Sequence, residues 1–163
     1  MVAFSSVSHM GFVTLGIAAG VFAASQRLGE GALAFSGAIF QMFAHGLISA
    51  MLFMVAGSIG HKVGTRNISD LGGAAARTPR LSAFVMVSFL ASLGLPGLVG
   101  FAAEFTVFVG TYQAFGWFVV LPIATVVLTA AYYIYAMQRA LFGPLNPKLA
   151  GMTDTHHYEN LPL

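Results

Sequence analysis

Four apolar runs, separated by short polar stretches, set the organisation of the chain. They cover about residues 2–24, 31–60, 81–113 and 115–142. A helix needs roughly 20 predominantly apolar residues to cross a bilayer. The pattern therefore predicts an all-α integral membrane protein, with a transmembrane helical region over residues 1–142 and a polar tail over residues 143–163.

The third apolar run, residues 81–113, is interrupted at Leu95-Pro96-Gly97. It is too long for one crossing helix of roughly 20 residues and too short for two joined by a turn. Pro96 removes a backbone donor and disfavours helix at Leu95. Local unwinding is also permitted by three glycines, Gly94, Gly97 and Gly100. We therefore expect four transmembrane segments, of which the third is a discontinuous helix.

Composition agrees with a membrane protein. Of the 163 residues, 58% are hydrophobic and 7% are charged, whereas a soluble domain carries about 25% charged residues. The absence of cysteine excludes a disulfide framework, a thiol metal site and cysteine-ligated iron–sulfur clusters. No basic region precedes the first apolar run, so we expect no secretory signal. No nucleic-acid surface is indicated, so we expect no nucleic-acid partner.

The basic residues predict the orientation of the segments. If each segment crosses once, the loop at residues 61–80 and the tail lie on one side, with Arg27 alone opposite. That side then holds Lys62, Arg66, Arg77, Arg80, Arg139 and Lys148. Because short loops rich in Lys and Arg stay cytoplasmic, we expect the N-terminus, this loop and the tail to face the cytoplasm. Two crossings by the third run would weaken the asymmetry to four against three.

A carboxyl and two histidines lie well inside the apolar runs and are the candidate functional residues. Glu104 follows the interruption by one or two helical turns, and His9 and His45 lie in the first and second runs. Broken helices at mid-membrane mark binding sites in transporters, and an intramembrane carboxyl is a functional hypothesis by default. A carboxyl and an imidazole removed from water can both exchange protons near neutral pH. We predict that these residues are stations of a proton path.

Other polar residues accompany them at helical spacing. The supporting polar residues are Gln41, Ser49, Ser5 and Ser92. Gln41 and Ser49 flank His45 by four residues on each side, so all three share a helix face. The hydroxyls could instead bond their own backbone, His9 could serve helix packing, and Glu104 could be a protonated structural carboxyl. We expect no metal site, since adjacent histidines in a tail, His156 and His157, rarely form one.

Three sequence motifs resemble the antiporter-like subunits of respiratory complex I, in particular the subunit M type, the counterpart of mitochondrial subunit 4. The motifs are Ser-Ser-Val-Ser-His-Met-Gly-Phe at residues 5–12, Gln-Met-Phe-Ala-His-Gly-Leu at residues 41–47, and Leu-Gly-Leu-Pro-Gly at residues 93–97, continued by Ala-Glu-Phe at residues 103–105. Their order and spacing agree with that family. The resemblance extends to about residue 142.

The resemblance implies helices ten to thirteen of a larger antiporter-like bundle of about fourteen helices. Glu104 falls on the family's terminal acidic residue, and His9 and His45 fall on its two central intramembrane histidines. It implies a proton-translocating membrane-arm subunit of an NADH- or F(420)H(2)-quinone oxidoreductase in a prokaryotic plasma membrane. We expect no cofactor in this chain. The implied partners are the other membrane-arm subunits, the missing N-terminal helices of the same subunit, and the lipid bilayer.

The sequence also departs from that family. The family's loop usually reads His-Thr-Arg-Asp-Ile, whereas residues 64–68 read Gly-Thr-Arg-Asn-Ile. The family's first half, with its glutamate–lysine pair, and its final helix have no counterpart here. We therefore expect the chain to be a fragment, a split-gene product or a truncated form. We do not assign a complete proton channel to it.

Several other functions remain open on the sequence. The same architecture occurs in the D-type subunit of multisubunit cation/proton antiporters and in the membrane subunit of energy-converting hydrogenases. A small drug/proton exchanger would place its carboxyl in an unbroken helix, which the Leu95-Pro96-Gly97 interruption disfavours. A structural assembly subunit predicts that neutralising Glu104 changes stability alone.

Overall fold

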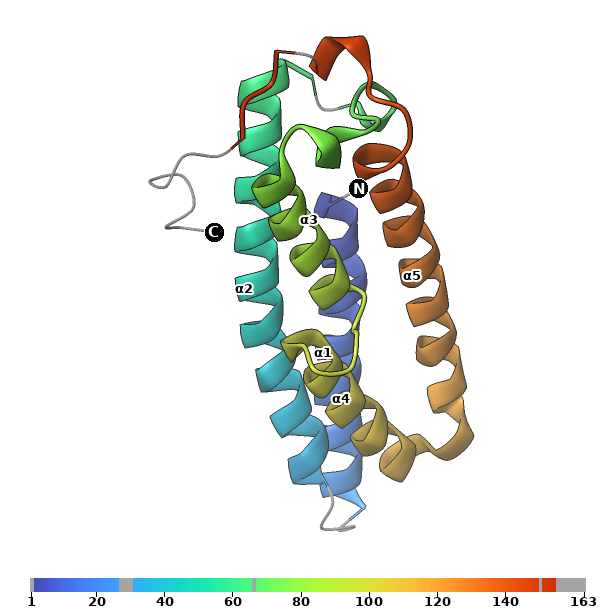
Figure 1. Ribbon diagram of the computed structural model, residues 1–163. Helices are drawn as coiled ribbons and strands as arrows, with labels where there is room; N and C mark the ends of the chain where they lie inside the picture. Colours follow the sequence, from blue (N-terminus) through green and yellow to red (C-terminus); the bar gives the residue numbers. More distant parts are fainter. Residues whose placement is uncertain (1, 27–30, 66, 150, 155–163) are drawn as a thin grey trace. The chain divides into compact units, whose positions relative to one another are not determined.

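The computed structural model describes residues 2–26, 31–65, 67–149 and 151–154, and helices dominate them (Figure 1). The long helices are α1 (Val2–Ser25), α2 (Gly31–Val63), α3 (Pro79–Ser92), α4 (Val99–Phe115) and α5 (Val120–Leu141). Short 3₁₀ helices lie between or after them: η1 (Ile68–Asp70), η2 (Ala74–Ala76), η3 (Gly116–Val119) and η4 (Pro147–Leu149). The described residues contain no strand, which confirms the all-α prediction.

Three helical stretches are long and apolar enough to cross a membrane. They are Val2–Ser25, Gly31–Val63 and Val99–Leu141, of which the last combines α4, η3 and α5. Helix α3 has 14 residues, fewer than the roughly 20 that a crossing requires. The third apolar run is thus divided between α3 and α4, which confirms the predicted discontinuous helix.

Backbone conformation explains the interruption between α3 and α4. Gly94 and Gly97 have φ angles of +77° and +97°, in the left-handed region that favours glycine. Between them, Pro96 has no N–H to continue a helical ladder. The interpretation of Gly100 was wrong, because this residue lies inside α4. A Cβ at Gly100 would overlap the carbonyl oxygen of Ala91, so glycine there permits close contact between the two sides of the interruption.

The chain divides into two compact units, and the first comprises Met1–Ser49 and Ala91–Ala130. Small residues bring its helices together. A Cβ at Gly16 of α1 would lie 3.0 Å from the carbonyl oxygen of Ala34 on α2. Cβ atoms at Gly37 and Gly110 would lie 2.7 Å and 2.6 Å from the backbone of Val107 and Ala34, respectively. Close packing of this kind associates membrane helices, because lipid offers no hydrophobic driving force between them.

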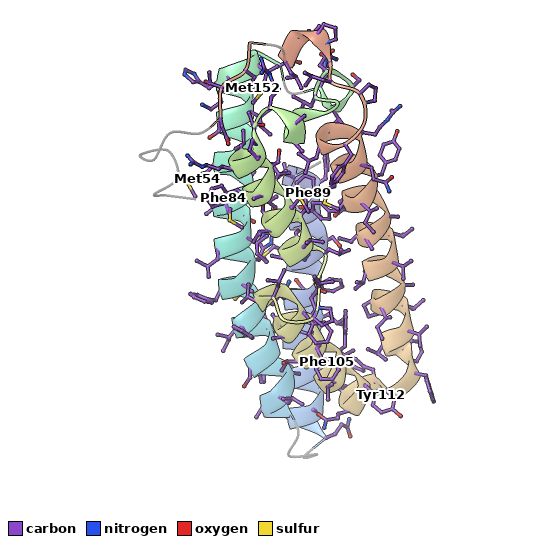
Figure 2. All side chains as sticks on the ribbon, in the orientation of Figure 1. Met54, Phe84, Phe89, Phe105, Tyr112 and Met152 are labelled. Atoms are coloured by element: carbon purple, nitrogen blue, oxygen red, sulfur yellow. The ribbon has the colours of Figure 1, made fainter. Side chains whose placement is uncertain are left out.

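The second unit comprises Ala50–Leu90 and Ala131–Leu163. Its core contains the buried residues Val55, Leu71, Ala74, Leu81, Val85, Ala140, Leu141, Leu149 and Met152. Phe84 and Phe89 of α3 pack against this core, and Figure 2 labels both together with Met152. The polar loop and the first part of the tail are therefore anchored by apolar contacts.

Polar contacts further attach the tail within the second unit. The carboxylate of Asp154 accepts backbone hydrogen bonds from Arg80 and Leu81, at 3.0 Å and 3.2 Å. These N–H groups belong to the first turn of α3, so Asp154 caps that helix from the tail. Lys148 Nζ lies 2.8 Å from Asp70 Oδ1, and this hydrogen bond holds the pKa of Asp70 below its ordinary value.

Several sequence predictions concern residues that the structure does not describe. Arg27, Arg66, His156 and His157 lie outside the described residues, and the predicted tail at residues 143–163 is described only to residue 154, without residue 150. The orientation inferred from the basic residues stays a prediction.

Candidate functional site

At the interruption between α3 and α4, the backbone of a glycine lies against a carboxyl group in the first unit. Glu104 lies in the second turn of α4 and is 5% exposed. An ideal Cβ at Gly94 would lie 2.6 Å from Glu104 Oε2. The carboxyl thus occupies space that any other residue at this position would fill. The two features singled out in the sequence, the interruption and the carboxyl, therefore form one site.

The other oxygen of this carboxyl faces a histidine on α1. His9 Nδ1 lies 3.3 Å from Glu104 Oε1, and His9 is 4% exposed. Ionised groups that are removed from water persist only when they are paired or hydrogen-bonded. His9 and Glu104 can be paired as imidazolium and carboxylate, or as imidazole and carboxylic acid, with the proton on either side of the same contact.

Two buried polar side chains complete the surroundings of His9. Its Nε2 lies 3.3 Å from the hydroxyl of Ser92, at the end of α3. The amide nitrogen of Gln41 on α2 lies 3.4 Å from Nδ1. A neutral imidazole carries its proton on one nitrogen only. With the proton on Nδ1, the ring donates a hydrogen bond to Glu104 and accepts one from Ser92. With the proton on Nε2, the ring donates to Ser92, and Nδ1 accepts a hydrogen bond.

The amide of Gln41 can form a hydrogen bond with either tautomer of the His9 ring. Its amide oxygen is buried and has no hydrogen-bond partner among the described residues. The oxygen and the nitrogen of an amide exchange places by a half-turn. When His9 carries its proton on Nδ1, that half-turn presents an acceptor to the ring; when the proton is on Nε2, the amide nitrogen donates. The site therefore accommodates two proton positions without leaving His9 unpaired.

His45 lies beside this buried group and is less buried. Its ring centroid is 5.2 Å from that of His9, with the planes inclined by 34°. Its Nε2 lies 3.1 Å from the hydroxyl of Ser6 and 2.9 Å from that of Ser49. The two histidines thus form neighbouring positions, one in the buried pair with Glu104 and one among hydroxyls.

The structure brings most of the residues singled out in the sequence into this one region. Ser5 is buried on α1, and its hydroxyl donates a hydrogen bond of 2.7 Å to the carbonyl oxygen of Val2. Sequence reasoning did not assign a site role to Ser6 or Gly94. Ser6 precedes His9 by three residues, so their shared helix face was a usable signal. Nothing in the sequence indicated that Gly94 lies against Glu104.

Apolar helices, one of them interrupted beside a buried carboxyl, define the class of this molecule as an all-helical membrane protein with a discontinuous helix. The chain belongs to the family described as "NADH:quinone oxidoreductase/Mrp antiporter, TM", whose model matches residues 1–129. This finding confirms the resemblance seen in the sequence motifs.

Particular relatives agree with the family. The chain is 49% identical over 154 residues to F(420)H(2) dehydrogenase subunit M of Methanosarcina mazei, covering 94% of this chain and 29% of that protein. It is 40% identical over 145 residues to NADH-quinone oxidoreductase subunit M of Rhodobacter capsulatus, covering 89% of this chain and 26% of that protein.

A solved structure is similar as well. It is a chain of respiratory complex I from Thermus thermophilus with bound NADH, with a TM-score of 0.82 and 34% identity, covering 97% of this chain and 31% of that chain. The chain thus spans about three tenths of the length of the relatives that it matches.

Proposed function

We propose that this chain is part of a proton-translocating membrane-arm subunit of a complex I-like quinone oxidoreductase. The observation that carries the proposal is the buried contact of 3.3 Å between His9 Nδ1 and Glu104 Oε1, beside the interrupted helix. Its role is proton transfer, and the redox chemistry, from NADH or F(420)H(2) to a quinone, belongs to other subunits. The relatives named subunit M support this assignment.

The geometry of the pair supports proton exchange between His9 and Glu104. Moving one proton from His9 Nδ1 to Glu104 Oε1 converts imidazolium and carboxylate into imidazole and carboxylic acid. The pair keeps its net charge during this step, so the step adds no uncompensated charge to a buried site. A change of charge nearby shifts the balance between the two states. Such a shift is how redox events elsewhere in an assembly would drive the proton.

His45 supplies the neighbouring position. Its contacts with Ser6 and Ser49 offer hydroxyls that can both donate and accept, as a proton relay requires. Because His45 is more exposed than His9, we place it on the side from which protons are exchanged with the central polar axis. Glu104 is then the terminal carrier.

The exposed surfaces of the helices support the proposed partners. Large apolar side chains are exposed on several helices, and examples are Phe4, Ile39, Phe105, Leu121 and Leu128. Figure 2 labels Phe105 on α4. We assign these surfaces to lipid, to the remaining helices of the same subunit and to other membrane-arm subunits. The location is the plasma membrane of a prokaryote, with the N-terminus and tail in the cytoplasm.

The test is Glu104→Gln in the complete assembly, in inverted membrane vesicles. Gln retains the size of Glu but cannot carry the proton. We expect proton uptake, followed with a pH-sensitive dye, to fall by about 100-fold for transfer through this site, within the range typical of a lost proton-transferring group. The quinone-reductase rate should fall with it, because turnover is coupled to proton transfer.

The matched control is Asp70→Asn, the same acid-to-amide change at a partly exposed ion pair in the second unit. It should leave proton uptake unchanged. If Glu104→Gln assembles normally and pumps like the unmodified protein, Glu104 is a structural carboxyl and this region is a scaffold. That outcome would favour the assembly role considered above and reject proton transfer at this site.

A further inference from the structure

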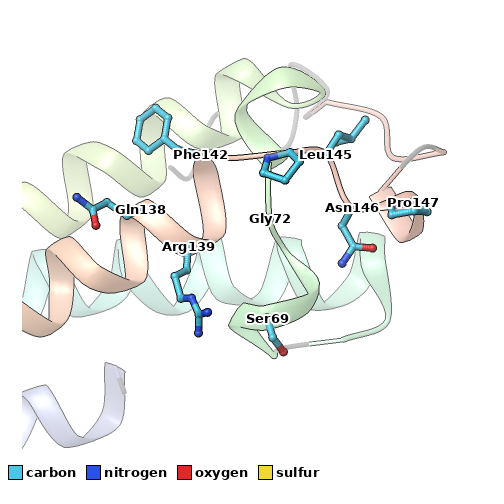
Figure 3. Close-up of a pocket in the computed structure, with 9 residues that line it drawn as sticks. Ser69, Gly72, Gln138, Arg139, Phe142, Leu145, Asn146 and Pro147 are labelled. Carbon is cyan, nitrogen blue, oxygen red and sulfur yellow. The ribbon is translucent and has the colours of Figure 1, made fainter.

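The second unit contains a surface cavity that the proposed proton path does not use. Its volume is about 630 Å³, and its lining includes Ser69, Gln138, Arg139, Phe142, Leu145 and Asn146. Figure 3 shows that these side chains come from the end of α5, from the segment after it and from η1. The cavity thus lies where a membrane-crossing helix ends and polar segments begin.

The cavity carries one positive charge. Among the described residues that line it, Arg139 alone is charged, and its guanidinium donates a hydrogen bond of 2.9 Å to the Tyr135 hydroxyl. The guanidinium carbon also lies 5.3 Å from the centre of the Tyr135 ring. The nearby carboxylate of Asp70 is occupied by Lys148, at 2.8 Å, so these two charges cancel. An anion is the ligand that this balance favours.

The walls of the cavity are held in place by backbone contacts. Gly73 N donates to the carbonyl oxygen of Phe142 at 3.3 Å, and Asn146 N donates to that of Gly72 at 3.0 Å. Gly73 has a φ of +75°, and a Cβ there would lie 2.7 Å from Leu145 Cα. Two segments far apart in sequence are therefore joined closely, and these contacts hold the walls of the cavity together.

The remaining lining groups suit a phosphate attached to a lipid. The amide oxygen of Asn146 accepts from Lys148 N at 3.0 Å, which leaves its NH2 group to donate. Ser69 and Gln138 add further donors, and a guanidinium can bind two phosphate oxygens at once. Phe142 and Leu145 are 50% and 40% exposed, so apolar surface adjoins these donors. Free phosphate gains nothing from contact with that apolar surface, whereas the acyl chains of a lipid can cover it.

We propose that this cavity binds the phosphate headgroup of an anionic membrane lipid, with Arg139 as its main anchor. A basic side chain next to an aromatic ring at the end of a membrane helix is a favourable position for such a headgroup. Bound lipid would then fix the end of α5 against the loop that contains Gly72.

The test is lipid retention by the assembled protein in neutral detergent, measured by native mass spectrometry with added phosphatidylglycerol. We expect Arg139→Gln to weaken binding by about fivefold, the factor that about 1 kcal/mol per interfacial cation represents. Arg80→Gln, the same change outside the cavity, should bind as the unmodified protein does. Arg139→Lys keeps the charge but not the planar fork, so its affinity should fall between the two.

Two further measurements distinguish a lipid phosphate from free inorganic phosphate as the ligand. Phosphatidylcholine has the same phosphate without net negative charge, and we expect it to bind more weakly. Excess inorganic phosphate should not displace the lipid. Displacement by phosphate together with equal binding of both lipids would make this a site for free anions and overturn the lipid assignment. Equal retention of phosphatidylglycerol by the Arg139 and Arg80 variants would remove the anchor and reject the proposal.

Discussion

Replacing Gly94 with alanine tests the link between the interrupted helix and the carboxyl of Glu104. The new Cβ would lie 2.6 Å from Glu104 Oε2, whereas ordinary contacts begin at 3.4 Å. The carboxyl is the end of a flexible side chain, so it is the group that moves. A displacement of about 0.8 Å exceeds what a hydrogen bond tolerates when it is already 3.3 Å long. Gly94→Ala should therefore separate Glu104 from His9.

The expected loss of stability of the Gly94→Ala variant has two parts. Alanine at the φ of +77° costs about 1–2 kcal/mol, because its Cβ approaches the following carbonyl oxygen. Leaving buried polar groups without their partner costs about 1–3 kcal/mol more. We expect Gly94→Ala to lower the free energy of unfolding by about 2–5 kcal/mol and to reduce proton uptake by the assembly.

Gly97→Ala is the matched control. Gly97 also has a positive φ, +97°, but a Cβ there meets nothing within 4 Å. It should lower stability by about 1–2 kcal/mol, from backbone strain alone, and leave the carboxyl in place. Both variants would be unfolded by anionic detergent in mixed micelles, with helix content followed by circular dichroism.

A double-mutant cycle identifies the contact responsible. In a Glu104→Ala background no carboxyl remains for the new Cβ to displace, so Gly94→Ala should cost no more than Gly97→Ala. The reasoning would be refuted by equal costs of the two glycine variants in the presence of Glu104, together with normal proton uptake. Gly94 would then be required only for the backbone conformation of the turn.

Two predictions concern the second unit. Because Lys148 lowers the pKa of Asp70 from 3.8, their contact stabilises the fold above that pH and is lost as pH falls through the lower, folded value. Lys148→Gln should reduce this acid-dependent loss in an unfolding series at decreasing pH, because Lys148 is the largest cause of the lowered pKa, whereas an unchanged series would refute the link. Asp154→Ala should cost about 1 kcal/mol and speed amide hydrogen exchange in the first turn of α3, as loss of a helix cap does; unchanged exchange there would show that the cap is dispensable.

The positions of the helices and of the interruption were predictable because they depend on local chemistry. An apolar run of sufficient length needs a helix in lipid, since backbone groups there have no water to bond. The glycines and Pro96 near the interruption act on their own backbone. The prediction failed for Gly100, because a glycine selected for close packing has the same sequence signal as one selected for a turn.

The site was only partly predictable. Helical spacing places Gln41, His45 and Ser49 on one face, and the rarity of a carboxyl in an apolar run draws attention to Glu104. Spacing within one helix does not state which face of the next helix it meets. The contacts of His9 with Ser92, 83 residues away, and with Glu104 therefore required the assembled fold.

The sequence by itself determined the membrane class, the helices, the interruption and the residue types that can carry a proton. Tertiary structure decided which of those residues meet. Close approach at Gly16, Gly37 and Gly110 sets how α1, α2 and α4 turn toward one another. That rotation turns His9 toward Glu104, and a glycine at position 94 leaves room for the carboxyl. Rotation between helices is a property of their packed surfaces, which no single stretch of sequence contains.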